Sequence, residues 1–227
     1  MEALVYDVHG NLPALEAVLD DARGDVERFV LGGDYALFGG WPKETIERLR
    51  ALPDALWIRG NGERWTASPD QAPDNPILPG AIEAAQQALG ARLVAELAAL
   101  PASITRGDTL ICHGSPVSDV RSFLPEPADD EAELLDGITA TRLIFGHTHL
   151  PFRRRTTNGI ELINPGSVGM PFDGDPRAAY ALVHDDGTIE HRRVAYDHEA
   201  SAAKVREHGS AWAEVVAKRI ERARADV

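Results

Sequence analysis

The chain has 227 residues, of which 44% are hydrophobic and 26% are charged, a composition typical of a globular protein with a sizeable core. Its 36 acidic and 23 basic residues give a net charge of −13, which disfavours binding to long nucleic acids. No apolar stretch approaches the roughly 18 residues that a membrane span needs. The first residues also lack the basic start and apolar core of a signal peptide. We therefore expect a cytoplasmic protein that binds neither a membrane nor a long nucleic acid.

Short apolar runs alternate with amphipathic stretches over the first 60 residues. Strands are expected at 3–6, 28–31 and 55–58, with helices at 12–22 and 43–52 between them. Because strands and helices alternate, this part predicts a parallel sheet covered by helices.

The segment from about 64 to 100 interrupts this rhythm. It is polar and rich in proline over 68–79, and a helix with a break near Gly90 is expected over about 81–100. Two interpretations stay open: a lid or wall over a substrate, or an extra helix packed on the core.

The second half of the chain is rich in short apolar runs. They predict strands at 109–112, 142–145, 160–163, 179–183 and 189–194. The last few follow one another without long helices, which predicts antiparallel pairing, and one long amphipathic helix is expected over about 201–225. We see no repeat or linker, so we predict a single domain over 1–227.

Five of the predicted strands end in short polar signatures. The signatures are Asp7-Val8-His9-Gly10-Asn11, Gly32-Gly33-Asp34, Gly60-Asn61-Gly62-Glu63, His113-Gly114-Ser115 and Gly146-His147-Thr148-His149. Ligands of α/β proteins bind outside the carboxyl ends of the strands, so we expect the five signatures to converge on one site.

Aspartate, imidazole and an amide oxygen are all ligands of divalent metal ions. Each signature alone has an ordinary interpretation, because Asp-x-His and Gly-Asp are common in turns and a lone histidine is usually structural. Their recurrence at five strand ends favours a site for two ions about 3.5–4 Å apart. Such a pair makes hydroxide available from a shared water, and this hydroxide attacks a phosphate ester.

The signatures resemble the calcineurin-like metallophosphoesterase superfamily, whose pattern is D-x-H, G-D, G-N-x-[D/E], H and G-H-x-H, over nearly the whole chain. Segments 113–116 and 164–169 are similar to its small bacterial phosphodiesterase branch. The resemblance implies an α/β fold, a four-layer α/β/β/α sandwich of two mixed sheets flanked by helices. It also implies ligand roles: Asp7, His9 and His149 for a first metal, Asn61, His113 and His147 for a second, and Asp34 as the bridge. By the same resemblance Asp34, Asn61 and His113 are catalytic.

The departures from the family pattern concern the substrate. The Asp-Arg pair of the protein phosphatases in this superfamily is absent after Asp34. Gly62 stands where those phosphatases carry the histidine that helps the leaving oxygen depart, a position that is often not histidine in the small bacterial branch. A well-stabilised leaving group needs less acid catalysis, so we expect a small phosphorylated substrate, with phosphodiesters or activated esters preferred. The alternatives are a phosphomonoesterase, a dinucleoside polyphosphate hydrolase, or a catalytically silent scaffold with the same fold. The cofactors expected are two divalent ions, manganese first, with iron, zinc, nickel, cobalt or magnesium as other candidates.

Four further features are open to interpretation. Asn11 is either a substrate contact or an ordinary helix N-cap, and Glu63 is a candidate to orient a ligand. Cys112 is expected to be a small core residue rather than a nucleophile. The arginines at 153–155 either touch phosphate or form a solvated edge, which is the commoner role of a charge run. Whether the chain forms a homo-oligomer is open.

Overall fold

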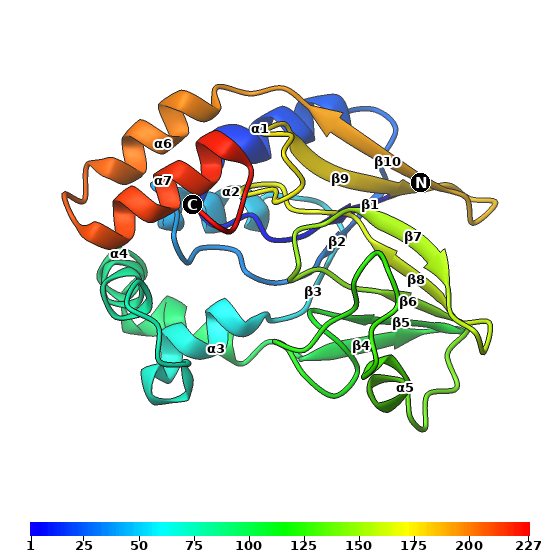
Figure 1. Cartoon of the computed structure of the whole chain (residues 1–227). Coiled ribbons are helices and arrows are strands. Elements are labelled where there is room, and N and C mark those ends of the chain that lie inside the picture. Colours follow the sequence, from blue (N-terminus) through cyan, green and yellow to red (C-terminus); the bar gives the residue numbers. More distant parts are fainter.

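Two five-stranded sheets form the centre of the computed structural model, which describes residues 1–227 (Figure 1). The first sheet consists of β10 (Ile189–Val194), β9 (Ala178–Val183), β1 (Glu2–Val5), β2 (Arg28–Leu31) and β3 (Ala55–Trp57), in that order. The second sheet consists of β4 (Ser103–Arg106), β5 (Thr109–Cys112), β6 (Arg142–Ile144), β8 (Glu161–Asn164) and β7 (Phe152–Arg155), in that order.

Both sheets are mixed, as predicted. β1, β2 and β3 are parallel to one another, β9 pairs with β1 in antiparallel orientation, and β10 pairs with β9 in antiparallel orientation. In the second sheet β5, β6 and β8 are parallel, with β4 and β7 as antiparallel edges. The antiparallel pairing predicted for the last strands is confirmed for β9 and β10 but wrong for β8. The reason is that β7, which was not predicted, forms a hairpin with β8 and so lets β8 run parallel to β6.

The helices flank the sheets. They are α1 (Leu12–Asp21), α2 (Pro42–Arg50), α3 (Asn61–Ala67), α4 (Leu78–Ala98), α5 (Glu131–Leu134), α6 (His198–Arg206) and α7 (Ala211–Arg222), with a 3₁₀ turn at Pro69–Gln71. The expected break in α4 is confirmed, because Gly90 has φ 73° and ψ 157°. The single helix predicted over 201–225 is wrong. Gly209 has φ +63°, which ends α6, and the Ser210 side chain accepts a hydrogen bond from the Ala213 N–H and begins α7.

Buried apolar residues form layers that confirm the predicted sandwich. One cluster lies between the sheets and includes Leu4 and Val30 of the first with Ile111 and Ile144 of the second. A second cluster packs α1 and α2 on the outer face of the first sheet. A third packs α5 and its neighbouring loops on the second sheet. None of the helices combines the length and apolar character needed to cross a membrane.

A fourth cluster joins the segment that interrupts the βα rhythm to the C-terminal helices. Trp65 of α3 and Leu78 of α4 pack there with Trp212 and Ile220 of α7. Figure 1 shows α3, α4, α6 and α7 together at one end of the molecule. Since α3 begins directly after β3, this end is the one at which the polar signatures lie.

Candidate metal centre

The seven predicted ligands lie together beyond the carboxyl ends of β1, β2, β3, β5 and β6. The ligand atoms of Asp7, His9 and His149 lie within 4.8 Å of one another, and so do those of Asp7, Asp34 and His113. All of these are buried, and so is Asn61. The structure therefore contains two adjacent buried His/Asp groups, an arrangement consistent with a dinuclear metal site.

The backbone of this site is strained. Five of the predicted ligands have positive φ angles although none is glycine: Asp7 at 53°, His9 at 50°, Asp34 at 55°, His147 at 66° and His149 at 58°. The left-handed region is uncommon for such residues, and strain of this kind persists only where the surroundings fix it. Its concentration at the ends of three strands, β1, β2 and β6, turns side chains from separate strands toward one point.

Three imidazole rings are held in a single tautomer by the backbone. The three contacts are His9 Nδ1 to Leu37 O (3.0 Å), His113 Nδ1 to Gly32 O (2.8 Å) and His149 Nδ1 to Met170 O (2.6 Å). A carbonyl only accepts, so Nδ1 donates in each ring and the Nε2 lone pair faces the site. Nε2 of His9 lies 3.1 Å from Nε2 of His149. Two lone pairs this close repel each other, and a cation between them relieves that repulsion.

Burial keeps two of the rings neutral. It lowers the pKa of His9 to about 3 and that of His147 to about 4, and neighbouring imidazoles add to the effect. A neutral imidazole is the form that binds a metal ion.

The two carboxylates face both groups. Oδ1 of Asp7 is buried without a hydrogen-bond partner, 3.5 Å from Nε2 of His149 and 3.8 Å from Nε2 of His113. Oδ1 of Asp34 lies 3.6 Å from Nε2 of His113, and its Oδ2 lies 3.9 Å from Nε2 of His9. Asp34 thus has the position of a bridge, and Asp7 is also within reach of both groups. A buried carboxylate oxygen with no donor is costly, so the donor set fits divalent cations.

The acid strengths of the two carboxyls differ. Burial opposes ionisation of Asp7, but the imidazoles of His149, His113 and His9 outweigh it and hold its pKa below the usual range. Burial raises the pKa of Asp34 to about 7, even though the nearby His113 opposes the rise. A bound cation would favour the ionised form of Asp34.

Asn61 completes the second group. The amide atom that faces the cluster lies 3.0 Å from Nε2 of His113 and 2.8 Å from Nδ1 of His147. These ring nitrogens, with the Asp119 carbonyl at 3.1 Å, are all acceptors in this geometry. An amide nitrogen satisfies them when no metal is bound, whereas a cation between them takes the amide oxygen instead.

Glu63 fixes the loops that carry Asp34 and Asn61. Its buried carboxylate accepts backbone N–H bonds from Asp34 (2.9 Å), Tyr35 (2.8 Å) and Gly60 (2.8 Å). Glu63 therefore connects the loop after β2 to the start of α3. These hydrogen bonds are how Glu63 would orient the ligands Asp34 and Asn61, as the sequence predicts.

Gly62 brings a donor close to Asp34. Its N–H donates to Asp34 Oδ1 at 2.6 Å, and a Cβ added to Gly62 would lie 2.9 Å from that oxygen. The residue that departs from the family pattern thus permits a close backbone contact to the candidate bridging carboxylate.

The segment at 164–169 supports two of the ligand loops. The Ser167 hydroxyl and the Gly169 N–H donate to the Asp7 carbonyl at 2.7 and 3.0 Å. The Asn164 amide donates to the Gly146 carbonyl at 2.9 Å, just before His147. Its resemblance to the bacterial branch therefore reflects a structural support of the site.

Asn11 and Cys112 have structural positions. The Asn11 side chain caps α1 through the Ala14 N–H, donates to Gly169 O at 2.8 Å and accepts from Ser201 Oγ at 2.9 Å. This geometry fits the N-cap alternative rather than a substrate contact. Cys112 is buried in the cluster that covers the second sheet, and burial raises the pKa of its thiol to about 12.

The arginines at 153–155 lie away from the site, on the edge strand β7. Arg153 pairs with Glu161 and Arg154 with Glu131, and most of the Arg155 side chain is exposed. They form a charged edge of the second sheet.

A cavity of about 170 Å³ opens onto the ligand groups. Five of the predicted ligands line it: His9, Asp34, Asn61, His147 and His149. Its remaining wall includes Phe38, Trp65, Phe172 and Arg219, none of which the sequence analysis identified. Neither motif nor spacing marks these residues, because they approach the cavity only through tertiary packing.

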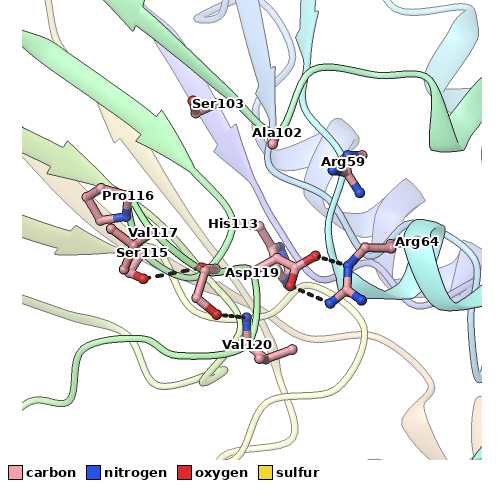
Figure 2. Close-up of a pocket in the computed structure, with 11 residues that line it drawn as sticks. Arg59, Arg64, Ala102, Ser103, His113, Ser115, Pro116, Val117, Asp119 and Val120 are labelled. Carbon is pink, nitrogen blue, oxygen red and sulfur yellow. Dashed lines mark hydrogen bonds and ion pairs between the residues drawn. The ribbon is translucent and has the colours of Figure 1, made fainter. Parts of the chain in front are cut away.

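A larger pocket of about 360 Å³ lies next to His113 (Figure 2). Figure 2 shows the Asp119 carboxylate paired with the Arg64 guanidinium, through contacts of 2.6 and 2.7 Å. Only one predicted ligand lines this pocket. The smaller cavity, with five, is therefore the better candidate for the substrate site.

The sequence model of the calcineurin-like phosphoesterase superfamily domain matches residues 2–188. The chain belongs to this superfamily. It is a metallophosphoesterase with candidate buried His/Asp metal sites, and the family implies small phosphorylated substrates.

Relatives of this metallophosphoesterase agree with the assignment. The phosphodiesterase YfcE of Escherichia coli K12 is 30% identical over 193 residues, covering 79% of this chain and 85% of its own. An uncharacterized protein of Methanocaldococcus jannaschii is 29% identical and covers 90% of this chain and 91% of its own. The crystal structure of a metallophosphoesterase from Sphaerobacter thermophilus superposes with a TM-score of 0.82 at 31% identity, covering 98% of each chain. The predicted kinship with small phosphodiesterases is confirmed.

Proposed function

We propose that this metallophosphoesterase uses two divalent ions to hydrolyse small phosphate esters, with phosphodiesters preferred. The observation that carries the proposal is the pair of adjacent buried ligand groups, which face each other across Asp7 and Asp34 and open into one cavity. The similarity to a phosphodiesterase at 30% identity supports the choice of diesters.

The seven proposed ligands form two sets, one for each ion, with one shared residue. Asp7, His9 and His149 hold the first, Asn61, His113 and His147 hold the second, and Asp34 lies between them. Bound divalent ions lower the pKa of water and offset the charge of the phosphoryl group. The carbonyl-anchored imidazoles keep their Nε2 lone pairs in place, so little reorganisation is needed on binding.

The side chains of the cavity wall indicate which leaving groups suit the site. Its titratable side chains are four of the proposed ligands and Arg219, and an arginine does not give up a proton near neutral pH. No side chain is therefore available to protonate a leaving alkoxide. Activated esters and diesters with stable leaving groups suit such a site best.

The interrupting segment supplies part of the wall. Trp65 of α3, Pro73, Asn75, Ile77 and Leu78 all line the cavity. We propose that this segment is a substrate wall within a single domain over 1–227, rather than an extra helix with only a packing role.

The test is an activity matrix on metal-free protein. Manganese, iron, zinc, nickel, cobalt and magnesium are each added back. Hydrolysis of bis(p-nitrophenyl) phosphate, cyclic nucleotides, p-nitrophenyl phosphate and a simple alkyl phosphomonoester is then measured. We expect the protein to bind two metal equivalents, to be activated most by manganese, and to show its highest kcat/KM with a diester. The Asp34→Asn variant should lose both this activity and the binding of two metal equivalents. Faster hydrolysis of simple alkyl monoesters than of any diester would refute the diester preference. Failure of every metal to restore activity would favour the scaffold alternative.

A further inference from the structure

One cation in the substrate cavity has no carboxylate partner. Arg219 lies on α7, is partly buried, and forms no ion pair. Its only protein hydrogen bond runs from Nε to the Ala225 carbonyl, at 3.2 Å. Burial lowers the pKa of this guanidinium. A desolvated guanidinium with free donors is a site for an anion.

One aromatic ring contacts both Arg219 and a proposed ligand. The ring of Phe172 stacks on His149, with centroids 4.4 Å apart and an angle of 21°. The Cζ atom of Arg219 lies 5.9 Å from the centroid of the same Phe172 ring. The guanidinium thus lines the cavity beside the ring that stacks on a proposed ligand.

This arrangement distinguishes two kinds of anion. The scissile phosphate has to lie against the ions held by the proposed ligands. Arg219 lines the same cavity but contacts Phe172 and forms no ion pair with Asp34, so it suits a second negative group on the substrate. The overall charge of −13 repels such a group, which makes a local cation necessary for its binding.

Arg219 is also held firmly in place. Trp212, Val216 and Ile220 of α7 pack in the cluster that contains Trp65 and Leu78 of the interrupting segment. The same packing shapes the apolar wall of the cavity. Helix α7 lies beyond residue 188, where the family match ends.

We propose that Arg219 is a specificity residue that binds a second anionic group, a phosphate or a carboxylate, on the substrate. The apolar wall formed by Phe38, Trp65 and Phe172 takes the organic part between the two anions. This inference rests on the proposed function, since it assigns the scissile phosphate to the ligand groups.

The experiment compares two esters that share one scissile bond. Thymidine 5′-(p-nitrophenyl phosphate) carries a single phosphate, and its 3′-phosphorylated form carries a second. Arg219→Ala is tested beside Arg222→Ala, an exposed arginine on the same helix outside the cavity. We expect Arg219→Ala to raise KM for the 3′-phosphorylated ester roughly 10–100-fold, as for the loss of a charged hydrogen bond. The rise in KM for the plain ester should be several-fold smaller than that for the 3′-phosphorylated ester.

A binding measurement separates this inference from the proposed function. Calorimetry on metal-loaded protein compares thymidine 3′,5′-bisphosphate with thymidine 5′-monophosphate. We expect wild type and Arg222→Ala to prefer the bisphosphate and Arg219→Ala to lose that preference. Arg219→Lys, which keeps the charge, should retain part of it, and it covers the case in which the alanine variant does not fold.

Two results would overturn the inference. One is an Arg219→Ala protein that behaves like Arg222→Ala with both ligands. The other is an equal loss for the singly and doubly charged ligands, which would assign Arg219 to the scissile phosphate or to packing. If wild type hydrolyses neither ester but still prefers the bisphosphate, the proposed function fails while the anion site stands.

Discussion

Glu63 offers the sharpest test of how the candidate metal centre is held together. The change is Glu63→Gln, which keeps the size of the side chain but removes its charge. One carboxylate oxygen accepts the N–H groups of Asp34 and Gly60, and the other accepts that of Tyr35. An amide has one acceptor oxygen, so its NH₂ group must face at least one backbone N–H.

The cost follows from these three bonds. One charge-assisted bond is lost, at roughly 1.5–3 kcal/mol, and the remaining bonds weaken to those of a neutral acceptor. We therefore expect the free energy of unfolding of the metal-free protein to fall by about 2–4 kcal/mol. Because Glu63 positions the loop of Asp34, metal affinity should also fall roughly 10–100-fold.

Urea unfolding of metal-free protein measures the first effect, and calorimetric titration with Mn²⁺ or Zn²⁺ measures the second. Glu207→Gln is the control, because Glu207 is exposed and pairs only with Lys204, and it should change stability by less than about 0.5 kcal/mol. If Glu63→Gln were as stable as this control and bound metal equally well, the reasoning about the three N–H bonds would be refuted.

Three further predictions concern the metals and the leaving group. Removal of metal with EDTA should lower the melting temperature, because each ion at 100 times its Kd stabilises the fold by about 2.7 kcal/mol. Calorimetry with and without two added equivalents of metal checks this, and an unchanged melting temperature contradicts it. Gly62→Ala should weaken metal binding, since its Cβ would lie 2.9 Å from Asp34 Oδ1. Gly24→Ala, which strains a residue with φ +89° but brings the added Cβ within 4 Å of no atom, is the control for a general loss of stability. Unchanged Kd values for Gly62→Ala would show that Asp34 can shift at no cost. In a series of phosphodiesters, kcat should fall steeply as the leaving group becomes more basic, because a general acid worth roughly 10²–10⁴-fold is missing; a flat dependence would reveal a proton donor.

Much of the fold could be predicted from local patterns. The strands at the N-terminal end, the helices between them and the break at Gly90 follow from apolar spacing and from glycine, and each lies where it was expected. The edge strands β4 and β7 were missed. The Arg-rich stretch of β7 shows no apolar alternation, because an edge strand buries little surface and gains its stability from pairing with β8.

The polar signatures, by themselves, determined which residues gather at the strand ends. Side chains directly after parallel strands meet at one edge of a sheet, whatever the rest of the chain does. This is why Asp7 and Asp34, which follow β1 and β2 of the first sheet, could be placed together from sequence. His113 follows β5 of the second sheet and joins them because the two sheets pack against each other. Their ligand roles rest on the family pattern and stay predictions for the metal titrations to test.

Only the tertiary structure decided what surrounds that cluster. The carbonyls that fix the imidazole tautomers, the three N–H groups on Glu63 and the closeness of Arg219 to Phe172 join residues far apart in the chain. Such contacts depend on how whole elements pack, and no local spacing encodes them. The sequence therefore determined the chemistry of the site, and packing decided its protonation, its support and the shape of the candidate substrate cavity.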